Sequence, residues 1–339
     1  DKTHPLSALR AKWERLQAPV SSIRLENLPA ADLASLLAAM LHLPDARATE
    51  LAELIGLRTG GNPFDTVEFV NALRHENILL LDPTGWHWDA VAIRRYVGKG
   101  DVIDLLQKRM ARLPPGAADL LECMACLGSE VEMARFAAAS GLPENQLEER
   151  LEAVLEDGLI VAEGTDTVRF RHDRVQQSAY QGLEPERRAA MHLAIARRLA
   201  GHAEYRMAAA EQYLPAHAAI DDEAEMAQAI ALFHAAARQA NLSSNAGASE
   251  HFLSAALALL DRLAQAPGVG ADHLSLRTTL EIDLHSALYS QGRLDDADVC
   301  YQRIESLAPD PFAMAAAGGV QVNSLTNRGR PQEALALGL

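Results

Sequence analysis

Alanine and leucine recur at helical spacing through most of this chain, and this pattern constrains the fold more than any other feature. The stretch ADLASLLAAMLHL, at about 30–43, is typical. Apolar residues make up 49 % of the 339 residues, but aromatic residues make up only 5 %. Small and unbranched apolar side chains favour closely packed helices over sheets. We therefore predict a mainly α-helical protein of two or three domains.

The charge and hydropathy of the chain argue against two classes of partner. A net charge of −15 disfavours a broad surface for nucleic acid or for an anionic membrane. No run reaches the roughly 18 apolar residues that span a bilayer. The chain opens with Asp1 and has no signal peptide. We therefore expect a cytoplasmic protein, cut from a longer chain, with no nucleic-acid or membrane partner.

Three cysteines are too few for a disulfide framework. Cys123 and Cys126 form a C-x-x-C inside the helical pattern LLECMACLG. A redox pair or half of a zinc site is one interpretation, and a pair of small buried side chains is the other. No second C-x-x-C or spaced histidine pair accompanies them, which favours burial. We predict neither a metal site nor a catalytic residue.

The stretch GLRTGGNPF, at 56–64, separates two predicted helices. Gly60 suits the left-handed residue that ends a helix, Asn62 suits an N-cap, and Pro63 suits the first helical position. The end of one helix and the start of another do not require a second glycine at position 61. Gly61 therefore raises the alternative that the backbone comes close to a bound ligand.

The N-terminal part of the chain contains one predicted helix and one predicted strand. HPLSALRAKWERL, at 4–16, has a helical pattern, and residues 20–26 alternate in the manner of a strand. The following 130 or so residues are almost wholly helical in pattern, so this strand has no evident partner nearby. Because an unpaired strand leaves its backbone polar groups unsatisfied, we expect its sheet to lie upstream of this chain.

Residues 101–183 predict a winged-helix domain, because three helices are followed there by two short strands in LIVAEGTDTVRFRHD. The third helix, ENQLEERLEAVLEDG, is rich in carboxylates and has a single arginine, Arg150. Such a helix would repel DNA phosphates. His172 lies where the second strand gives way to a helix that Asp173 can cap. By pattern alone, His172 is more often a structural residue than a ligand contact.

Everything from about 187 onward is helical in pattern. ALYSQGRLDDADVCYQRIESLAP places Gly292, Ala297, Tyr301 and Pro309 at the spacing of a tetratricopeptide repeat. NSLTNRGRPQEALALGL repeats the glycine–alanine spacing, and ASEHFLSAALALL is a degenerate precursor. We therefore predict an arm of helical hairpins that binds a protein partner.

Several motifs in this chain resemble, in order, one known arrangement. LRTGGNPF, GWHWD, RLPPGAADLLECMACLG, FRHDRVQQSAY and RRAAMHLAIARRL are similar to the ATPase module of the STAND class of P-loop NTPases. The closest likeness is to bacterial proteins that fuse a serine/threonine kinase, this ATPase and often a sensor histidine kinase. The resemblance covers about residues 4–200.

The resemblance and the repeat pattern together imply four domains, and the resemblance implies a nucleotide site. The domains would be the tail of a nucleotide-binding core at 1–28, a helical lid at 29–100, the winged helix at 101–185 and the repeats at 186–339.

The resemblance also implies a role for single residues. Pro63 of the G-N-P motif would pack near the adenine, with Gly61 and Asn62 in the same loop. His172 would reach the β-phosphate of ADP and hold a closed, inactive state. An aromatic residue commonly follows the phenylalanine of this motif, whereas this chain has Asp65.

One part of the ATPase pattern is absent from this sequence. No G-x-x-x-x-G-K-[ST] occurs, and the nearest match, VGKGD at 97–101, lacks the upstream glycine and the hydroxyl residue. We expect this chain alone to be inactive and to hold no nucleotide tightly, with ATP or ADP and Mg²⁺ bound by the intact parent, where the partner of this part would be the upstream core. The alternatives are a nucleotide-independent interaction module and, less favoured, a transcription regulator.

Overall fold

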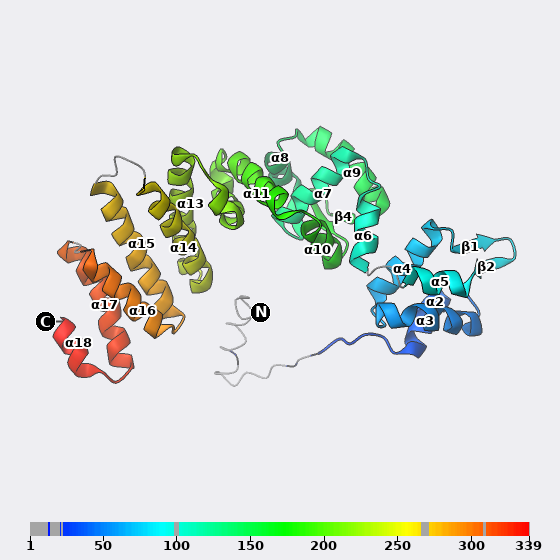
Figure 1. Ribbon diagram of the computed structural model, residues 1–339, viewed down its shortest axis with the longest axis horizontal. Coiled ribbons are helices and arrows are strands. Elements are labelled where there is room, and N and C mark those ends of the chain that lie inside the picture. The colour runs from blue at the N-terminus through cyan, green and yellow to red at the C-terminus, as the bar shows by residue number, and fades with distance from the viewer. Residues whose placement is uncertain are drawn as a thin grey trace. The chain divides into compact units, whose positions relative to one another are not determined.

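The computed structural model describes residues 13, 21, 23–97, 102–265, 271–307 and 310–338. This part of the chain contains 17 α-helices and two small antiparallel sheets. It divides into two compact units (Figure 1). Among the described residues, one unit comprises those within 19–137 and 142–184, and the other comprises those within 138–141 and 185–339. The prediction of a mainly helical protein is confirmed.

The two predictions for the N-terminal segment have different outcomes. The helix predicted at 4–16 lies outside the described residues, except for Trp13. The strand predicted at 20–26 is wrong, since the described residues of this segment form no strand. Ile23 and Leu25 are 87 % and 91 % exposed. A strand needs a hydrogen-bonded neighbour, and no described segment supplies one here.

The unit that contains residues 19–137 and 142–184 begins with four helices and a β-hairpin. In the hairpin, Leu79 pairs with Trp88 and Asp82 pairs with Gly85. Its elements are α2 (Ala30–Leu41), α3 (Asp45–Thr59), α4 (Pro63–His75), β1 (Leu79–Asp82), β2 (Gly85–Trp88) and α5 (Ala90–Val97).

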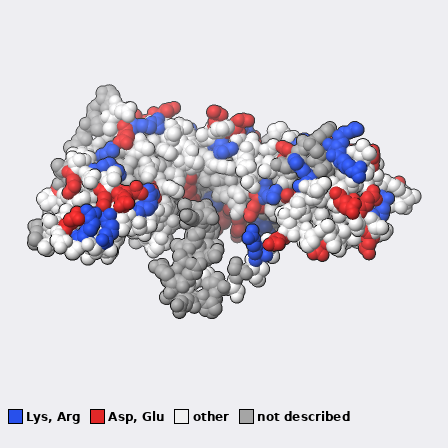
Figure 2. All heavy atoms as spheres, turned by 60° about the horizontal axis from the view of Figure 1, so that its bottom comes forward, with Lys and Arg blue, Asp and Glu red and all other residues white. Residues whose placement is uncertain are grey.

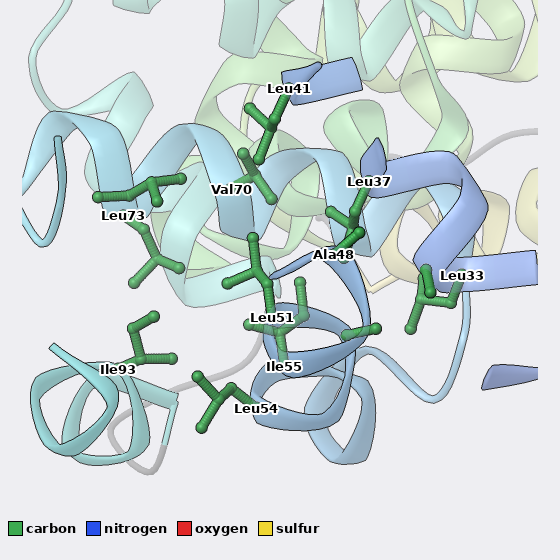
Figure 3. Packing of buried hydrophobic residues seen from close by; sticks show 13 residues of the cluster. Leu33, Leu37, Leu41, Ala48, Leu51, Leu54, Ile55, Val70, Leu73 and Ile93 are labelled. Atoms are coloured by element: carbon green, nitrogen blue, oxygen red, sulfur yellow. The ribbon is translucent and has the colours of Figure 1, made fainter. Parts of the chain in front are cut away.

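One hydrophobic cluster joins these helices (Figure 3). Leu37 of α2, Leu51 and Ile55 of α3, and Leu73 of α4 are fully buried within it. Buried members of the cluster recur at intervals of three or four along each helix, as at Leu33, Leu37 and Leu41 of α2, so each helix buries one face. This packing fixes where α3 ends and α4 begins, and therefore fixes the loop between them.

The second half of this unit combines helices with a three-stranded sheet in the order β3–β5–β4. Its elements are α6 (Val102–Met110), α7 (Pro115–Leu127), β3 (Glu130–Glu132), α8 (Met133–Ser140), α9 (Glu144–Asp157), β4 (Ile160–Glu163), β5 (Thr167–Phe170) and α10 (Asp173–Gln181). The predicted hairpin of two strands is confirmed. The sequence did not predict β3, in which Val131 pairs with Val168.

The other unit, here called the helical unit, contains the end of α8 and all the helices from α11 onward, and its described residues form no strand. They are α11 (Pro185–Ala200), α12 (Arg206–Tyr213), α13 (Glu223–Leu242), α14 (Ala246–Leu263), α15 (Ala271–Ser290), α16 (Leu294–Ser306), α17 (Pro311–Asn327) and α18 (Pro331–Gly338), with two 3-10 turns, Ala203–Tyr205 and Leu214–Ala219.

Consecutive helices of this helical unit pack against each other, and α15 also packs against α17. Gly292 and Gly329 occupy equivalent turns, before α16 and before α18, with φ of 73° and 70°. Ala297 and Ala334 are buried at equivalent places in the second helix of each pair. The two stretches with similar spacing therefore form similar helical hairpins. Pro309, the remaining residue of the predicted pattern, lies outside the described residues.

Candidate functional site

The loop between α3 and α4 has the helix-capping chemistry that its sequence predicts. Gly60 takes a left-handed conformation with φ of 57°, and its N–H donates to the carbonyl of Gly56 at 2.8 Å. The Asn62 side chain accepts from the Asp65 N–H at 3.2 Å, and Pro63 is the first residue of α4. These assignments for Gly60, Asn62 and Pro63 are confirmed.

Gly61 has a structural role of its own, so the view that only a ligand would require this glycine is wrong. Its φ is 77°, a value that disfavours any side chain. A Cβ at this position would lie 2.2 Å from the Leu28 carbonyl oxygen. The Gly61 carbonyl accepts the Leu28 N–H at 2.8 Å. The close approach that excludes a side chain is therefore one between two segments of the chain itself.

His172 is the N-cap of α10, a place that the sequence analysis gave to Asp173. Its backbone is extended, and its Nδ1 accepts the Arg174 N–H at 3.2 Å. Asp173 is instead the first helical residue. Because a neutral imidazole that accepts at one nitrogen carries its hydrogen on the other, Nε2–H is a donor. His172 can therefore donate a hydrogen bond to an anion while it caps the helix.

The loop and His172 are in direct contact. The rings of Phe64 and His172 stack with centroids 3.9 Å apart and an interplanar angle of 13°. Beside this stack, Arg174 Nη1 lies 3.2 Å from Asp65 Oδ2. Asp65, which stands where the resemblance expects an aromatic residue, thus forms an ion pair across the same contact. The first turn of α4 therefore meets the first turn of α10.

A second set of charges holds the middle of α4. Arg109 of α6 donates to Glu68 Oε2 at 2.8 Å and to Asp157 Oδ2 at 2.6 Å. Arg109 also donates to the Asp157 carbonyl, which completes a three-acceptor arrangement around one guanidinium. Glu68 and Arg109 are mostly buried. Together with the Phe64–His172 stack, these bonds attach α4 to the helices that follow it.

An open groove of about 810 Å³ lies on the side of the loop that carries Gly60 and Gly61. It is bordered mainly by small residues of α2 and α3, and Leu57 at its edge is 96 % exposed. Neither Pro63 nor His172 lines this groove. Pro63 is exposed on the surface, and Asn62 is half-buried.

The remaining sequence features concern the C-x-x-C pair, metal binding and membrane spans. Cys123 and Cys126 are buried in α7, as one of the two interpretations expects. Among the described residues, no three histidine, cysteine or acidic side chains form a group that could hold a metal ion. No helix in the described ranges is long and apolar enough to cross a bilayer. On the face shown in Figure 2, basic and acidic side chains are interspersed.

Phe64, Asp65 and Arg174 are partners in this contact that the sequence did not predict. Asp65 and Arg174 carry opposite charges in the first turns of their helices, but nothing in the sequence pairs one with the other.

The comparisons with known proteins give one distant similarity. No protein-family model matches the chain, and no curated protein matches it. The crystal structure of a signal transduction ATPase with numerous domains (STAND protein) with a tetratricopeptide repeat sensor, from Pyrococcus horikoshii, is similar to 94 % of this chain. The identity is 13 % and the TM-score is 0.38. This chain covers 47 % of that protein.

Proposed function

We propose that this chain is the regulatory part of a nucleotide-switched signalling ATPase related to the STAND class. Residues 29–100 would be its helical lid, 101–185 a winged helix and 186–339 a tetratricopeptide-like arm for a protein partner. One observation carries the proposal: the G-N-P-F loop and His172 are in ring-to-ring contact. The sequence resemblance assigns these two segments, far apart in the chain, to the two ends of one nucleotide.

The local chemistry around His172 suits a phosphate. Nε2–H is a donor because Nδ1 accepts the Arg174 N–H. The positive end of the α10 dipole and the Arg174 guanidinium lie close by, and both favour an anion. At the other end of the proposed ligand, the exposed ring of Pro63 offers a rigid apolar edge. These residues fit contacts to the base and to the β-phosphate, but not a site for Mg²⁺.

Exposed apolar side chains in the segment before α2 and at the groove beside the loop support a partner domain. Ile23, Leu25 and Leu57 are almost fully exposed, and the groove beside Gly61 is lined mostly by small residues. Exposed apolar surface of this kind is common at protein interfaces. We propose that a nucleotide-binding core, with the phosphate loop and magnesium ligands that this sequence lacks, covers it.

In this mechanism the chain contributes a hydrogen bond that depends on the state of the nucleotide. Bound ADP would supply a β-phosphate as acceptor for Nε2–H of His172, so lid and winged helix would stay together. Exchange for ATP would have to weaken this arrangement and release the arm for its partner. A ligand can shift such an equilibrium only by its difference in affinity for the two states.

The test uses a protein in which this chain is joined to its nucleotide-binding core. His172→Ala should weaken ADP binding by about 1–3 kcal/mol, as for a lost charge-assisted hydrogen bond, and should change ATP binding less. Pro63→Ala should weaken both nucleotides equally, because the base is common to them. An unchanged ratio of ADP to ATP affinity in His172→Ala, measured by calorimetry, would contradict the proposal.

This chain alone should hydrolyse no ATP and bind ATP or ADP weakly. Micromolar binding of either nucleotide to the chain by itself would show that the phosphate loop is not needed, and would favour a different site.

A further inference from the structure

We infer that Asp65 is a positioning residue for His172, and that it acts through Arg174. The inference deepens the proposed function, because it concerns the histidine that the switch would use. It rests on a chain of three contacts that the structure shows without any ligand: the ion pair of Asp65 and Arg174, the cap of α10, and the stack on Phe64.

The first step is the ion pair. The Asp65 side chain is 10 % exposed and the Arg174 side chain is 37 % exposed. Asp65 is fixed in the first turn of α4 by the Asn62 cap, and the same helix buries Phe69 and Val70. The carboxylate is therefore a fixed point, and the longer arginine side chain reaches toward it. Holding this guanidinium holds the first turn of α10 against α4.

The second step connects Arg174 to His172. The backbone N–H of Arg174 donates to His172 Nδ1, so the imidazole follows the position of this turn. The same ring lies parallel to Phe64, the residue next to Asp65. One face of the imidazole and one of its nitrogens are thus engaged, which leaves the ring little freedom and gives Nε2–H a defined direction.

The third step is electrostatic. The N-terminal ends of α4 and α10 both carry partial positive charge, and their first turns meet at this contact. The Asp65 carboxylate places negative charge there and offsets the repulsion. His172 is therefore held in position before any phosphate arrives, and a ligand would not have to order it.

A purely structural ion pair would add stability without fixing the imidazole, and the two roles can be separated by NMR. Stacking on Phe64 displaces the ring-proton resonances of His172 upfield, and this displacement reports the stack itself. Asp65→Asn keeps the shape of the side chain and removes its charge. Arg174→Met removes the charge from the more exposed side chain, so it serves if the first variant folds poorly. Arg174→Lys keeps the charge.

We expect the upfield displacement to be lost in Asp65→Asn and in Arg174→Met, and largely kept in Arg174→Lys. Glu163→Gln is the matched control, because it removes the carboxylate of another ion pair in the same unit, with Arg169, away from this contact. It should leave the His172 resonances unchanged. His172→Gln identifies those resonances by their disappearance.

A displacement that persists in a folded Asp65→Asn or Arg174→Met protein would overturn the inference, since the stack would then form without the ion pair. Loss of the displacement in Glu163→Gln would overturn it as well. The measurement contains no nucleotide, so its outcome is independent of the ADP and ATP affinities that test the proposed function.

Discussion

The contact between α4 and α10 and the interior of the helical arm both depend on polar side chains, but they bury their histidines to different degrees. At the α4–α10 contact, Arg174 is 37 % exposed and His172 is half-buried. Between α15, α16 and α17, the Glu281 and Arg303 side chains are 3 % and 46 % exposed, much as Asp65 and Arg174 are 10 % and 37 % exposed, but His285 is fully buried.

The buried groups of the arm have fixed partners on neighbouring helices. Arg303 donates to both Glu281 oxygens, and the Cys300 thiol donates to the same carboxylate. His285 Nε2 lies 3.0 Å from Gln321 Oε1, and Gln321 in turn donates to Asp298. Burial and the nearby Glu281 raise the pKa of Cys300 to about 12, so this cysteine is a structural thiol.

The burial of each histidine determines how easily it can change its hydrogen-bond partner. A fully buried histidine that loses its partner has no water to replace it, so His285 cannot exchange its contact with Gln321 without local unfolding of the arm. At the α4–α10 contact, water reaches the half-buried His172, so this histidine can change its partner at a smaller cost. Under the proposed function, the α4–α10 contact would be the part that switches, and the polar groups within the arm would hold its helices together, a scaffolding role.

The largest expected effect tests the scaffolding role. Arg303→Met leaves Glu281 charged and buried without its main partner, which should destabilise the helices around it by about 3–5 kcal/mol. Native-state hydrogen exchange of the α15 and α16 amides would measure this locally. A loss of stability below about 1 kcal/mol would mean that the Arg303–Glu281 pair contributes no more than an exposed ion pair does, and would contradict the scaffolding role.

The next effect concerns the backbone of the loop. Gly60→Ala should cost about 1–2 kcal/mol, the usual penalty for a side chain in the left-handed region. Gly61→Ala should cost more, because its Cβ would meet the Leu28 carbonyl at 2.2 Å, whereas that of Gly60 meets only the Asn27 side chain at 3.6 Å. Hydrogen exchange of α3 and α4 gives both values. Equal costs would show that the approach of Leu28 is not what selects glycine at 61.

A smaller effect should appear with pH. Burial lowers the pKa of His285 below its ordinary value of about 6.5, and Nδ1 has no hydrogen-bond partner among the described residues. The unfolded chain therefore binds a proton more readily than the folded arm, so stability should fall as the pH drops below about 6.5.

His285→Gln should flatten this dependence when protection of the α15 and α17 amides is compared at neutral and mildly acidic pH. His192 is buried as well, and its pKa is also lowered, mainly by burial, so some dependence should remain in α11. An unchanged slope at α15 in His285→Gln would contradict the assignment.

The smallest effect is expected at an exposed ion pair. Arg112 and Glu76 are 2.9 Å apart, with side chains 55 % and 39 % exposed. Arg112→Met should change stability by no more than about 1 kcal/mol, because water screens and replaces such pairs. The stability loss in Arg112→Met, measured by the same hydrogen exchange, gives the small value with which the loss in Arg303→Met is compared. A larger loss here would mean that exposure does not separate the two kinds of ion pair.

The sequence by itself determined the parts of this protein that depend on neighbouring residues. Helical periodicity located α2, α3 and most later helices, and capping chemistry located Gly60, Asn62 and Pro63. Alternation and a turn located the strands of the β4–β5 hairpin. Each of these features is decided within a few residues, because backbone hydrogen bonds and caps in helices and hairpins are local.

Only the tertiary structure decided the contacts between distant segments. The three residues of β3 become a strand because β5 lies beside them. The described residues of the segment 20–26 form no strand, and no described strand lies beside them. Gly61 is required by Leu28, and Phe64 and Asp65 meet His172 and Arg174 from another helix. Such pairings depend on how the helices pack, and the packing is set by the buried apolar faces of the whole unit rather than by any one stretch of sequence.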